Sequence, residues 1–411
     1  MAVKFVFIFL TLLLISASGI GQEKQTYSLP EAIDRALRNN PDVLMAQKEI
    51  EAAKGRKLQA ISPEQPELNL AWEGIESGGS LSKAKERNIT LSQNLEFPSK
   101  YILKRGVGQR EFDIALENLG RIKSLVAARV KGAYYKVKYF ERLVETLEFT
   151  LGLLNQFRDA TLFKYQAGEL PYFEVIRAKV EIAKTQNEIL EAKKELQTYQ
   201  TELNLILGRF GSEELNLTDE LIFVPFQESK EQTLPRLTQQ SKSLKIARLT
   251  LEKEAKNLSL ARSSFIPDLS LTGGMLSEGG QGYIPSFGVG ITLPLWWWNP
   301  KGQIQENRAN LQIAETRKQA LERIVKGKIE RAFDLVQASQ EQVELFEKTL
   351  LKEVDEELKA GINSYQYNQI DALGLLDIYR TNKTTKTEYY KTLYNYLSAL
   401  ADLEVAGETS E

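Results

Sequence analysis

Acidic residues close to two predicted helix turns are the part of this sequence with the clearest capacity to act on a solute. Glu169 and Glu174 follow Gly168, and Asp371 follows Gly361. Copies of one such acid around a symmetry axis would form a ring of carboxylates, which favours cations at a constriction. The alternative for each acid is an ordinary solvated charge on a helix. We therefore treat Glu169, Glu174 and Asp371 as candidate gate or selectivity acids.

The residues that most often perform catalysis are missing, because the chain has neither histidine nor cysteine. Their absence removes the usual general base, the commonest transition-metal ligand, thiolate nucleophiles and disulfides. The acids of segment 353–357 occupy neighbouring helical positions, which fan around a helix instead of converging on a metal. The formal net charge of -2 provides no basic surface for nucleic acid. We expect no enzyme, no catalytic residues, no cofactor, no resident metal and no nucleic-acid partner.

The first 21 residues are predicted to be a signal peptide. Lys4 provides the positive start, residues 5–15 are apolar, and Ala17 and Gly19 fit the small positions before a cleavage site. Cleavage after Gly21 fits nearly as well, and the alternative is an N-terminal anchor helix, for which the apolar stretch is short. No cysteine follows, so a lipid-anchored N-terminus is not expected, and the chain is predicted to be exported.

The rest of the chain is predicted to contain two copies of one pattern. The segment PELNL at 66–70 recurs as PDLSL at 267–271, about 200 residues later. Each copy is expected to run helix, strand, strand, long helix, turn, helix. The predicted divisions are a first repeat at 22–208, a connector at 209–235, a second repeat at 236–406 and a tail at 407–411.

Long helices with a seven-residue apolar repeat are the main element of each copy, so the fold class is mainly α with a small β part. In the first copy the repeat includes Leu119, Val126, Ala133, Phe140, Leu147 and Leu154, and in the second Ile329, Val336, Val343 and Leu350. Sustained heptads indicate helices coiled around neighbours. We expect Gly168, with Pro171, and Gly361 to form the turns between paired helices. A plain coiled-coil rod fits the heptads alone.

Four segments alternate between apolar and polar residues, as transmembrane strands facing a wet lumen do. The residues predicted to face lipid are Leu91, Leu95, Phe97, Ile291, Leu293 and Trp297. Trp296–Trp298 are expected to form an aromatic girdle. Alternation also fits a half-buried soluble sandwich. Because four strands cannot close a membrane barrel and open edges are not tolerated in lipid, several copies are needed: three give twelve strands and four give sixteen.

Several segments resemble the TolC family of outer-membrane efflux proteins. The segment LPEAIDRALRNNP at 29–41 looks like the opening signature of that family, and 376–381 with 399–404 are similar to its final helix. Gly168 with EVIRA at 174–178 matches its helical turn. The resemblance covers essentially the whole mature chain. A finer resemblance, carried by LWWWNPKG at 295–302, is to the outer-membrane members of heavy-metal efflux systems.

This resemblance implies a homotrimer with a 12-stranded β-barrel in the outer membrane and a long α-helical barrel in the periplasm. Its tip would meet a periplasmic adaptor and an inner-membrane pump that drives export of small solutes or metal cations. One departure is the segment between Gly361 and Leu376, which is longer than its counterpart in the first copy. The alternatives are a type I protein secretion channel and an exported coiled-coil structural protein without a transport role.

Overall fold

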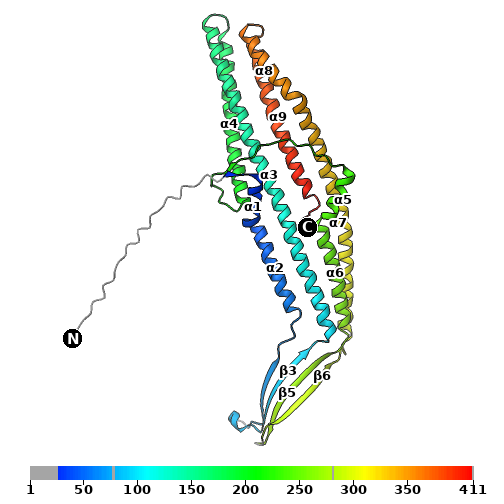
Figure 1. Ribbon diagram of the computed structural model, residues 1–411. Helices are drawn as coiled ribbons and strands as arrows, with labels where there is room; N and C mark the ends of the chain where they lie inside the picture. Colours follow the sequence, from blue (N-terminus) through cyan, green and yellow to red (C-terminus); the bar gives the residue numbers. More distant parts are fainter. Residues whose placement is uncertain (1–25, 76–78, 280–281, 410–411) are drawn as a thin grey trace, which may run out of the picture.

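The computed structural model describes residues 26–75, 79–279 and 282–409 of the chain, which form one elongated molecule (Figure 1). The predicted signal peptide, residues 1–21, lies outside the described residues. A four-stranded sheet forms one end of the rod, and two helical turns form the other. Among the described residues no helix is both long enough and apolar enough to cross a membrane.

The chain contains two successive sets of elements in the same order. The first set is β1 (Thr26–Tyr27), α1 (Leu29–Asn39), α2 (Pro41–Gln59), β2 (Glu67–Glu73), η1 (Leu81–Lys83), β3 (Glu86–Leu95), α3 (Pro98–Gln166) and α4 (Tyr172–Ile206). The second is β4 (Asn216–Leu217), α5 (Lys230–Gln240), α6 (Lys242–Ser263), β5 (Asp268–Glu278), β6 (Ile284–Thr292), α7 (Trp298–Leu345), η2 (Phe346–Leu350), α8 (Leu351–Gln366) and α9 (Ala372–Glu404). The predicted internal duplication is confirmed.

Equivalent capping residues start each copy. Ser28 and Ser229 both begin capping boxes, at α1 and α5. The helical stretch predicted before each strand pair consists of two helices, because Asn40 and Ser241 accept hydrogen bonds from backbone N–H groups and start α2 and α6. The capping box at Ser229 starts α5 within the segment 209–235 that we propose as the connector.

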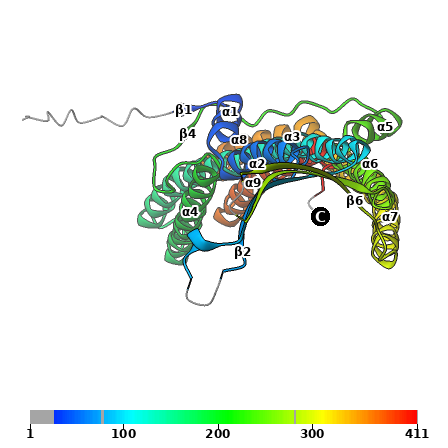
Figure 2. The same ribbon diagram turned by 90° about the horizontal axis from the view of Figure 1, so that it is seen from below.

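The helices form a single curved layer whose neighbours change along the rod. Beside the sheet the order is α2, α3, α6, α7, and toward the tip it is α4, α3, α9 and α7–α8. Figure 2 shows this curved layer with α4 at one edge and α7 at the other. The predicted heptad residues Val126, Leu147 and Leu154 of α3 are buried against these neighbours, as are Ile329 and Val336 of α7.

The second long helix contains a π-helical segment that the heptads did not predict. Buried Val144 and Leu154 of α3 are ten positions apart. Their counterparts in the second copy, the buried residues Val343 of α7 and Val354 of α8, are eleven positions apart. The additional residue is accommodated in η2, a wider helical turn of the kind that absorbs insertions. Leu350, predicted to continue the heptad, lies in this turn and is 36% exposed.

The sheet has the order β2-β3-β5-β6, and all of its pairs are antiparallel. The register places Leu68, Leu91, Gly273 and Phe287 in one row across the four strands. The next row contains the polar or small residues Glu67, Ser92, Thr272 and Gly288. Because rows alternate between faces, one face is apolar and the other is polar.

Candidate functional site

The apolar face of the sheet is largely uncovered in the single chain. Leu91 is 52% exposed and Ile291 is 61% exposed, and Leu95 shares their face. A contiguous exposed apolar surface of this kind marks contact with lipid or another protein. The structure places these three predicted residues on one face of the strands.

The other three predicted lipid-facing residues lie beyond the strands. β3 ends at Leu95 and β6 ends at Thr292, so Phe97, Leu293 and Trp297 lie where the sheet meets the helices. All three are exposed. Phe97 and Trp297 occupy the positions that start α3 and α7, both at the edge of the sheet. The strands are therefore shorter than predicted.

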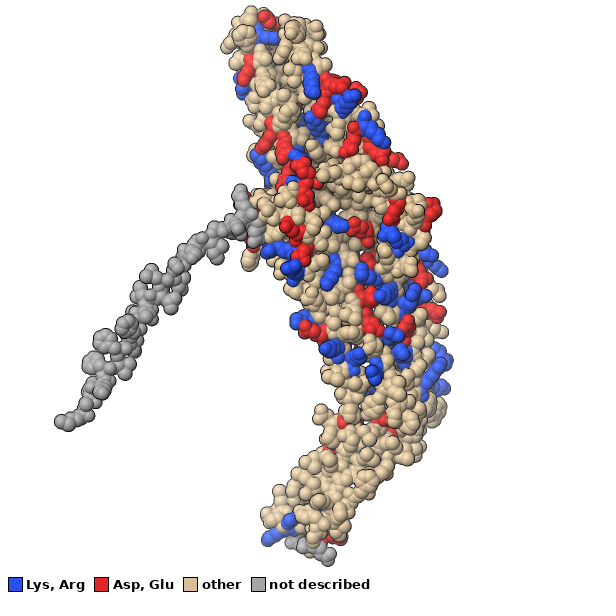
Figure 3. All heavy atoms as spheres, in the orientation of Figure 1, with Lys and Arg blue, Asp and Glu red and all other residues tan. Residues whose placement is uncertain are grey.

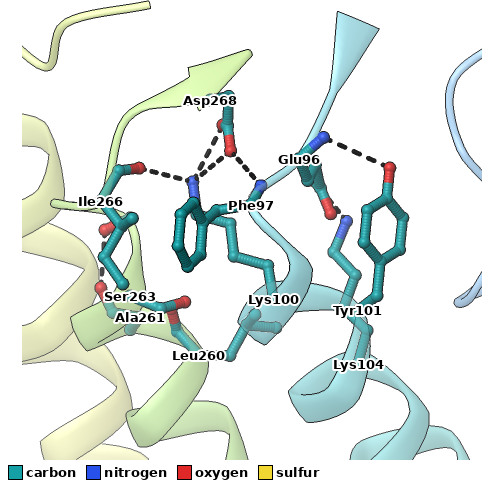
Figure 4. A network of polar contacts seen from close by, with 11 residues as sticks. Glu96, Phe97, Lys100, Tyr101, Lys104, Leu260, Ala261, Ser263, Ile266 and Asp268 are labelled. Atoms are coloured by element: carbon teal, nitrogen blue, oxygen red, sulfur yellow. Dashed lines mark hydrogen bonds and ion pairs between the residues drawn. The ribbon is translucent and has the colours of Figure 1, made fainter.

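A partly buried polar network joins the sheet to the helices (Figure 4). The Lys100 ammonium donates to both carboxylate oxygens of Asp268 at 2.8 Å and to the carbonyl of Ile266 at 3.0 Å. Asp268 also accepts the backbone N–H of Phe97 at 2.9 Å. The Lys100 side chain is only 10% exposed. Sequence reasoning missed this network, in which Asp268 was noticed only as part of the repeated segment.

The first helical tip has the turn that the sequence predicts. Gly168 has a φ of +79°, a conformation that glycine adopts without strain. Its N–H donates to the carbonyl of Tyr165 at 2.9 Å, and the N–H of Glu169 donates to the carbonyl of Lys164 at 2.9 Å. Pro171 then precedes α4 as its N-cap residue.

The second tip is turned by Asn368, so the prediction of Gly361 as its turn residue is wrong. Asn368 has a φ of 57°, which asparagine tolerates better than most residues. Gly361 lies inside α8 and is buried, and a Cβ there would be 2.4 Å from the Cδ1 of Ile378 on α9. The glycine therefore allows two helices to pack closely.

The corrected turn also removes the predicted departure between the two copies. α3 ends at Gln166 and α4 begins at Tyr172, and α8 ends at Gln366 and α9 begins at Ala372. The two loops thus have equal lengths. The Tyr-Gln pair that precedes each loop, at 165–166 and 365–366, was a signal that could have located the second turn.

The three candidate acids have different surroundings. Glu169 is exposed in the first turn. The Glu174 side chain is 11% exposed and lies 3.3 Å from the guanidinium of Arg177. Asp371 is the N-cap of α9, where its carboxylate accepts the N–H of Gly374 at 2.8 Å. Two of these acids therefore have structural partners within the chain.

Ion pairs between α4 and α9 hold the two tip hairpins together. The Arg380 guanidinium lies 2.8 Å from Glu181, whose side chain is 8% exposed, and Lys383 lies 2.8 Å from Glu188. The hydrogen bond from Arg380 holds the pKa of the Glu181 carboxyl below its ordinary value. Among the described residues no group of three or more acidic side chains is arranged to hold a metal.

We expect Gly361→Leu to lower the free energy of unfolding by about 1–3 kcal/mol, because the new side chain overpacks the contact with α9. Asn368→Gly should leave this free energy within about 1 kcal/mol, because glycine accepts the positive φ of the turn. Thermal unfolding of the purified variants measures both effects. A loss for Asn368→Gly as large as that for Gly361→Leu would contradict the assignment.

Acid should loosen the contact between α4 and α9. Because the folded-state pKa of Glu181 is lowered, its stabilising effect is present above its ordinary value of 4.5 and is lost as the pH falls through the folded value. Hydrogen exchange of the tip, followed from neutral pH to below 4.5, should show this loss. The Glu181→Gln variant should lack this component, and an unchanged acid profile in that variant would exclude Glu181 as its source.

Comparison with known proteins agrees with this architecture. The profile of a family described as outer membrane efflux protein matches residues 32–209 and 233–406. The chain belongs to the outer membrane efflux protein family. As a member, it is an outer-membrane efflux protein.

Individual relatives are distant but extend over most of the chain. The cobalt-zinc-cadmium resistance protein CzcC of Cupriavidus metallidurans is 21% identical over 89% of this chain and 86% of its own. The cation efflux system protein CusC of Escherichia coli strain K12 is 24% identical, covering 86% of this chain and 80% of its own.

Solved structures share the fold. A structure of CusC covers 93% of this chain and 92% of its own, with a TM-score of 0.77 and 18% identity. The open state of the Neisseria gonorrhoeae MtrE outer membrane channel covers 92% of this chain and 88% of its own, with a TM-score of 0.78 and 18% identity. The predicted mainly helical fold with a small sheet is therefore confirmed.

Proposed function

We propose that three copies of this chain close into one duct, with twelve strands in the membrane barrel. Within the described residues β2 and β6 are the two edges of the sheet and each pairs on one side only. Open strand edges are not tolerated in lipid, so the β2 edge of one copy pairs with the β6 edge of the next. Three copies give a barrel within the usual size range.

The helical layer supports the same arrangement. Its open edges are α2 and α4 on one side and α7 on the other, which continue the β2 and β6 edges of the sheet (Figures 1 and 2). Both edges carry exposed apolar residues. These are Phe173, Ile176, Val180 and Leu190 on α4, and Ile313, Ile324, Leu335 and Leu345 on α7. Burial of these two stripes against each other favours a closed ring.

The duct acts as a passive conduit and performs no chemistry of its own. The two turns around Gly168 and Asn368 lie at the end of the rod farthest from the sheet (Figure 1). We place the periplasmic adaptor at this tip, with an inner-membrane pump supplying the energy. The signal peptide, residues 1–21, directs export, and residues 22–208 and 236–406 remain the proposed repeats.

Metal cations are the cargo that the comparisons favour. CzcC is a cobalt-zinc-cadmium resistance protein and CusC a cation efflux system protein by name. A chain without histidine or cysteine does not contradict this cargo, because tight ligands along the wall would hold the ions back. Glu169 is the best placed of the three candidate acids to form a ring, since it is exposed and lies at the tip. Glu174 and Asp371 are engaged in the contacts described above.

The test is growth of a deletion strain, with and without the gene restored, across graded metals, dyes, antibiotics and detergents. Sensitivity confined to metals, and reversed by the restored gene, is the expected result. Sensitivity to hydrophobic drugs would instead indicate multidrug export. Accumulation of an unexported protein without any solute sensitivity would indicate the alternative, a type I secretion channel.

A further inference from the structure

The helices that meet the sheet share a pattern that duct closure does not require. In α3, Ile102 is 72% exposed near the sheet, and exposed Arg105 lies three residues farther from it. α6 runs toward the sheet, so the order in the sequence is reversed and Arg262 precedes the exposed Phe265, which lies just after α6. In both places an apolar side chain lies nearer the sheet, and a cation lies about one helical turn, or about 5 Å, farther away.

The other two junctions repeat this order. In α2, which also runs toward the sheet, exposed Lys54 precedes Leu58, which is 67% exposed. At the start of α7, Trp297 is exposed and Lys301 follows one turn later, with its ammonium 5.4 Å from the centre of the Trp297 ring. The pattern therefore occurs at all four helix–strand junctions, in both copies of the duplicated unit.

The cations of this pattern are available to an outside partner. Within the described ranges, Arg105, Arg262 and Lys301 are exposed and none forms an ion pair with a carboxylate. The neighbouring acids Asp268 and Glu96 are instead paired with Lys100 and Lys104. Figure 3 shows a sheet end with few charges, some red acidic atoms at its border with the helices, and blue and red side chains together on the helices above it.

The acids that remain in this region do not cancel these cations. Glu254 within α6 is paired with Lys253, whereas the carboxylate of Glu64 before β2 accepts only a hydrogen bond from the Asn94 amide at 3.1 Å and keeps its charge. Glu306 on α7 is exposed, more than one turn beyond Lys301. Glu64 and Glu67, beside the first strand, are exposed and form no ion pair among the described residues, so the unpaired positive charge lies at the junctions of α3, α6 and α7.

We propose that these junctions form a collar that binds the phosphate headgroups of phospholipids in the periplasmic leaflet of the outer membrane. We define the collar as Lys54, Leu58, Ile102, Arg105, Arg262, Phe265, Trp297 and Lys301. In the proposed duct the collar lies on the outer side, next to the apolar face of the sheet, where the hydrocarbon ends and the headgroups begin. This proposal rests on placing the sheet in the outer membrane.

The depth of the two layers matches that of a bilayer. A hydrocarbon core of about 30 Å within a bilayer of about 40–45 Å leaves about 5–8 Å of headgroup on each side. The separation of about 5 Å between apolar and cationic side chains fits this layer. Aromatic residues favour the hydrocarbon boundary, and cations favour anionic headgroups. The collar then fixes how deeply the duct sits in the membrane.

The test compares the purified full chain with the R105Q/R262Q/K301Q variant. A matched control, K352Q/K359Q/K391Q, removes three exposed lysines of α8 and α9, far from the sheet. Insertion is measured into phosphatidylcholine vesicles with and without phosphatidylglycerol, at low salt. The wild type and the control should prefer the anionic vesicles. The preference of the collar variant for anionic over neutral vesicles should be at least about fivefold weaker than that of the wild type. A change of about fivefold is the effect expected from removing one cation at an anionic surface.

Equal preference in the collar variant and the wild type would overturn the proposal. Abolition of the preference by inorganic phosphate, at matched ionic strength, would also overturn it, because the site would then bind free anions. Insertion of the wild type without any headgroup preference counts against the collar alone. Failure of the wild type to insert into either kind of vesicle would count against the proposed duct itself.

Discussion

Replacing Leu91 with arginine is expected to abolish assembly of the protein in the outer membrane, while the same change at Ser92 is tolerated. Leu91 lies in the middle of β3 on the apolar face, beside Leu68 and Gly273 of the neighbouring strands. An arginine that faces lipid near the middle of a bilayer costs about 2–4 kcal/mol. Every copy in the duct bears this cost, so the effect accumulates on assembly.

Ser92 is a matched control because it is the next residue on the same strand. Its row contains Glu67 and Thr272 on the polar face, where an arginine can remain hydrated and lie beside a carboxylate. The measurement is the amount of folded oligomer in isolated outer membranes, resolved by gels without heating. Equal loss in both variants, or a greater loss for Ser92→Arg, would contradict the assignment of the two faces.

The sequence predicted well wherever a feature repeats along the chain. Alternation in β3 and β6 located the two faces of the sheet because a strand has a period of two residues. The heptads of α3 located its buried side for the same reason, and Ser28 with Glu31 located the start of α1. These signals are local, so they do not depend on knowing which elements pack together.

The errors arose where packing between distant segments decides the role of a residue. Glycine is common in turns, but at position 361 the absence of a side chain allows α8 to approach Ile378 on α9. Asn368 makes the turn instead, and one residue in the sequence does not distinguish these two uses. The π-helical turn at 346–350 similarly depends on keeping α8 in phase with α9, which only the assembled structure shows.

The network at Lys100 was also invisible in the sequence, because its partners are 166 and 168 residues away. We expect Lys100→Met to lower the free energy of unfolding by about 2 kcal/mol, less than for a fully buried pair, because it leaves the Asp268 carboxylate, which is 34% exposed, without its cation. The change also removes a donor from the Ile266 carbonyl. Because this network ties β5 to the start of α3, the loss weakens the connection between membrane sheet and periplasmic helices.

Lys104→Met provides the control for this prediction. Lys104 pairs with Glu96 at 2.6 Å in the same region, but its side chain is 35% exposed against 10% for Lys100. A pair more open to solvent contributes about 1 kcal/mol or less. Chemical unfolding of the purified protein in detergent measures both free energies. An equal effect of the two substitutions would show that burial of Lys100 does not determine the strength of its network.

Asp268→Asn in the Lys100→Met background separates the lost charge from other effects. Asparagine keeps a carbonyl oxygen that accepts the N–H of Phe97, but it leaves no unpaired charge behind. The double variant should therefore recover part of the stability that Lys100→Met loses, which a double-mutant cycle quantifies. Absence of any recovery would mean that the lysine stabilises the junction through packing and its bond to Ile266, with the carboxylate uninvolved.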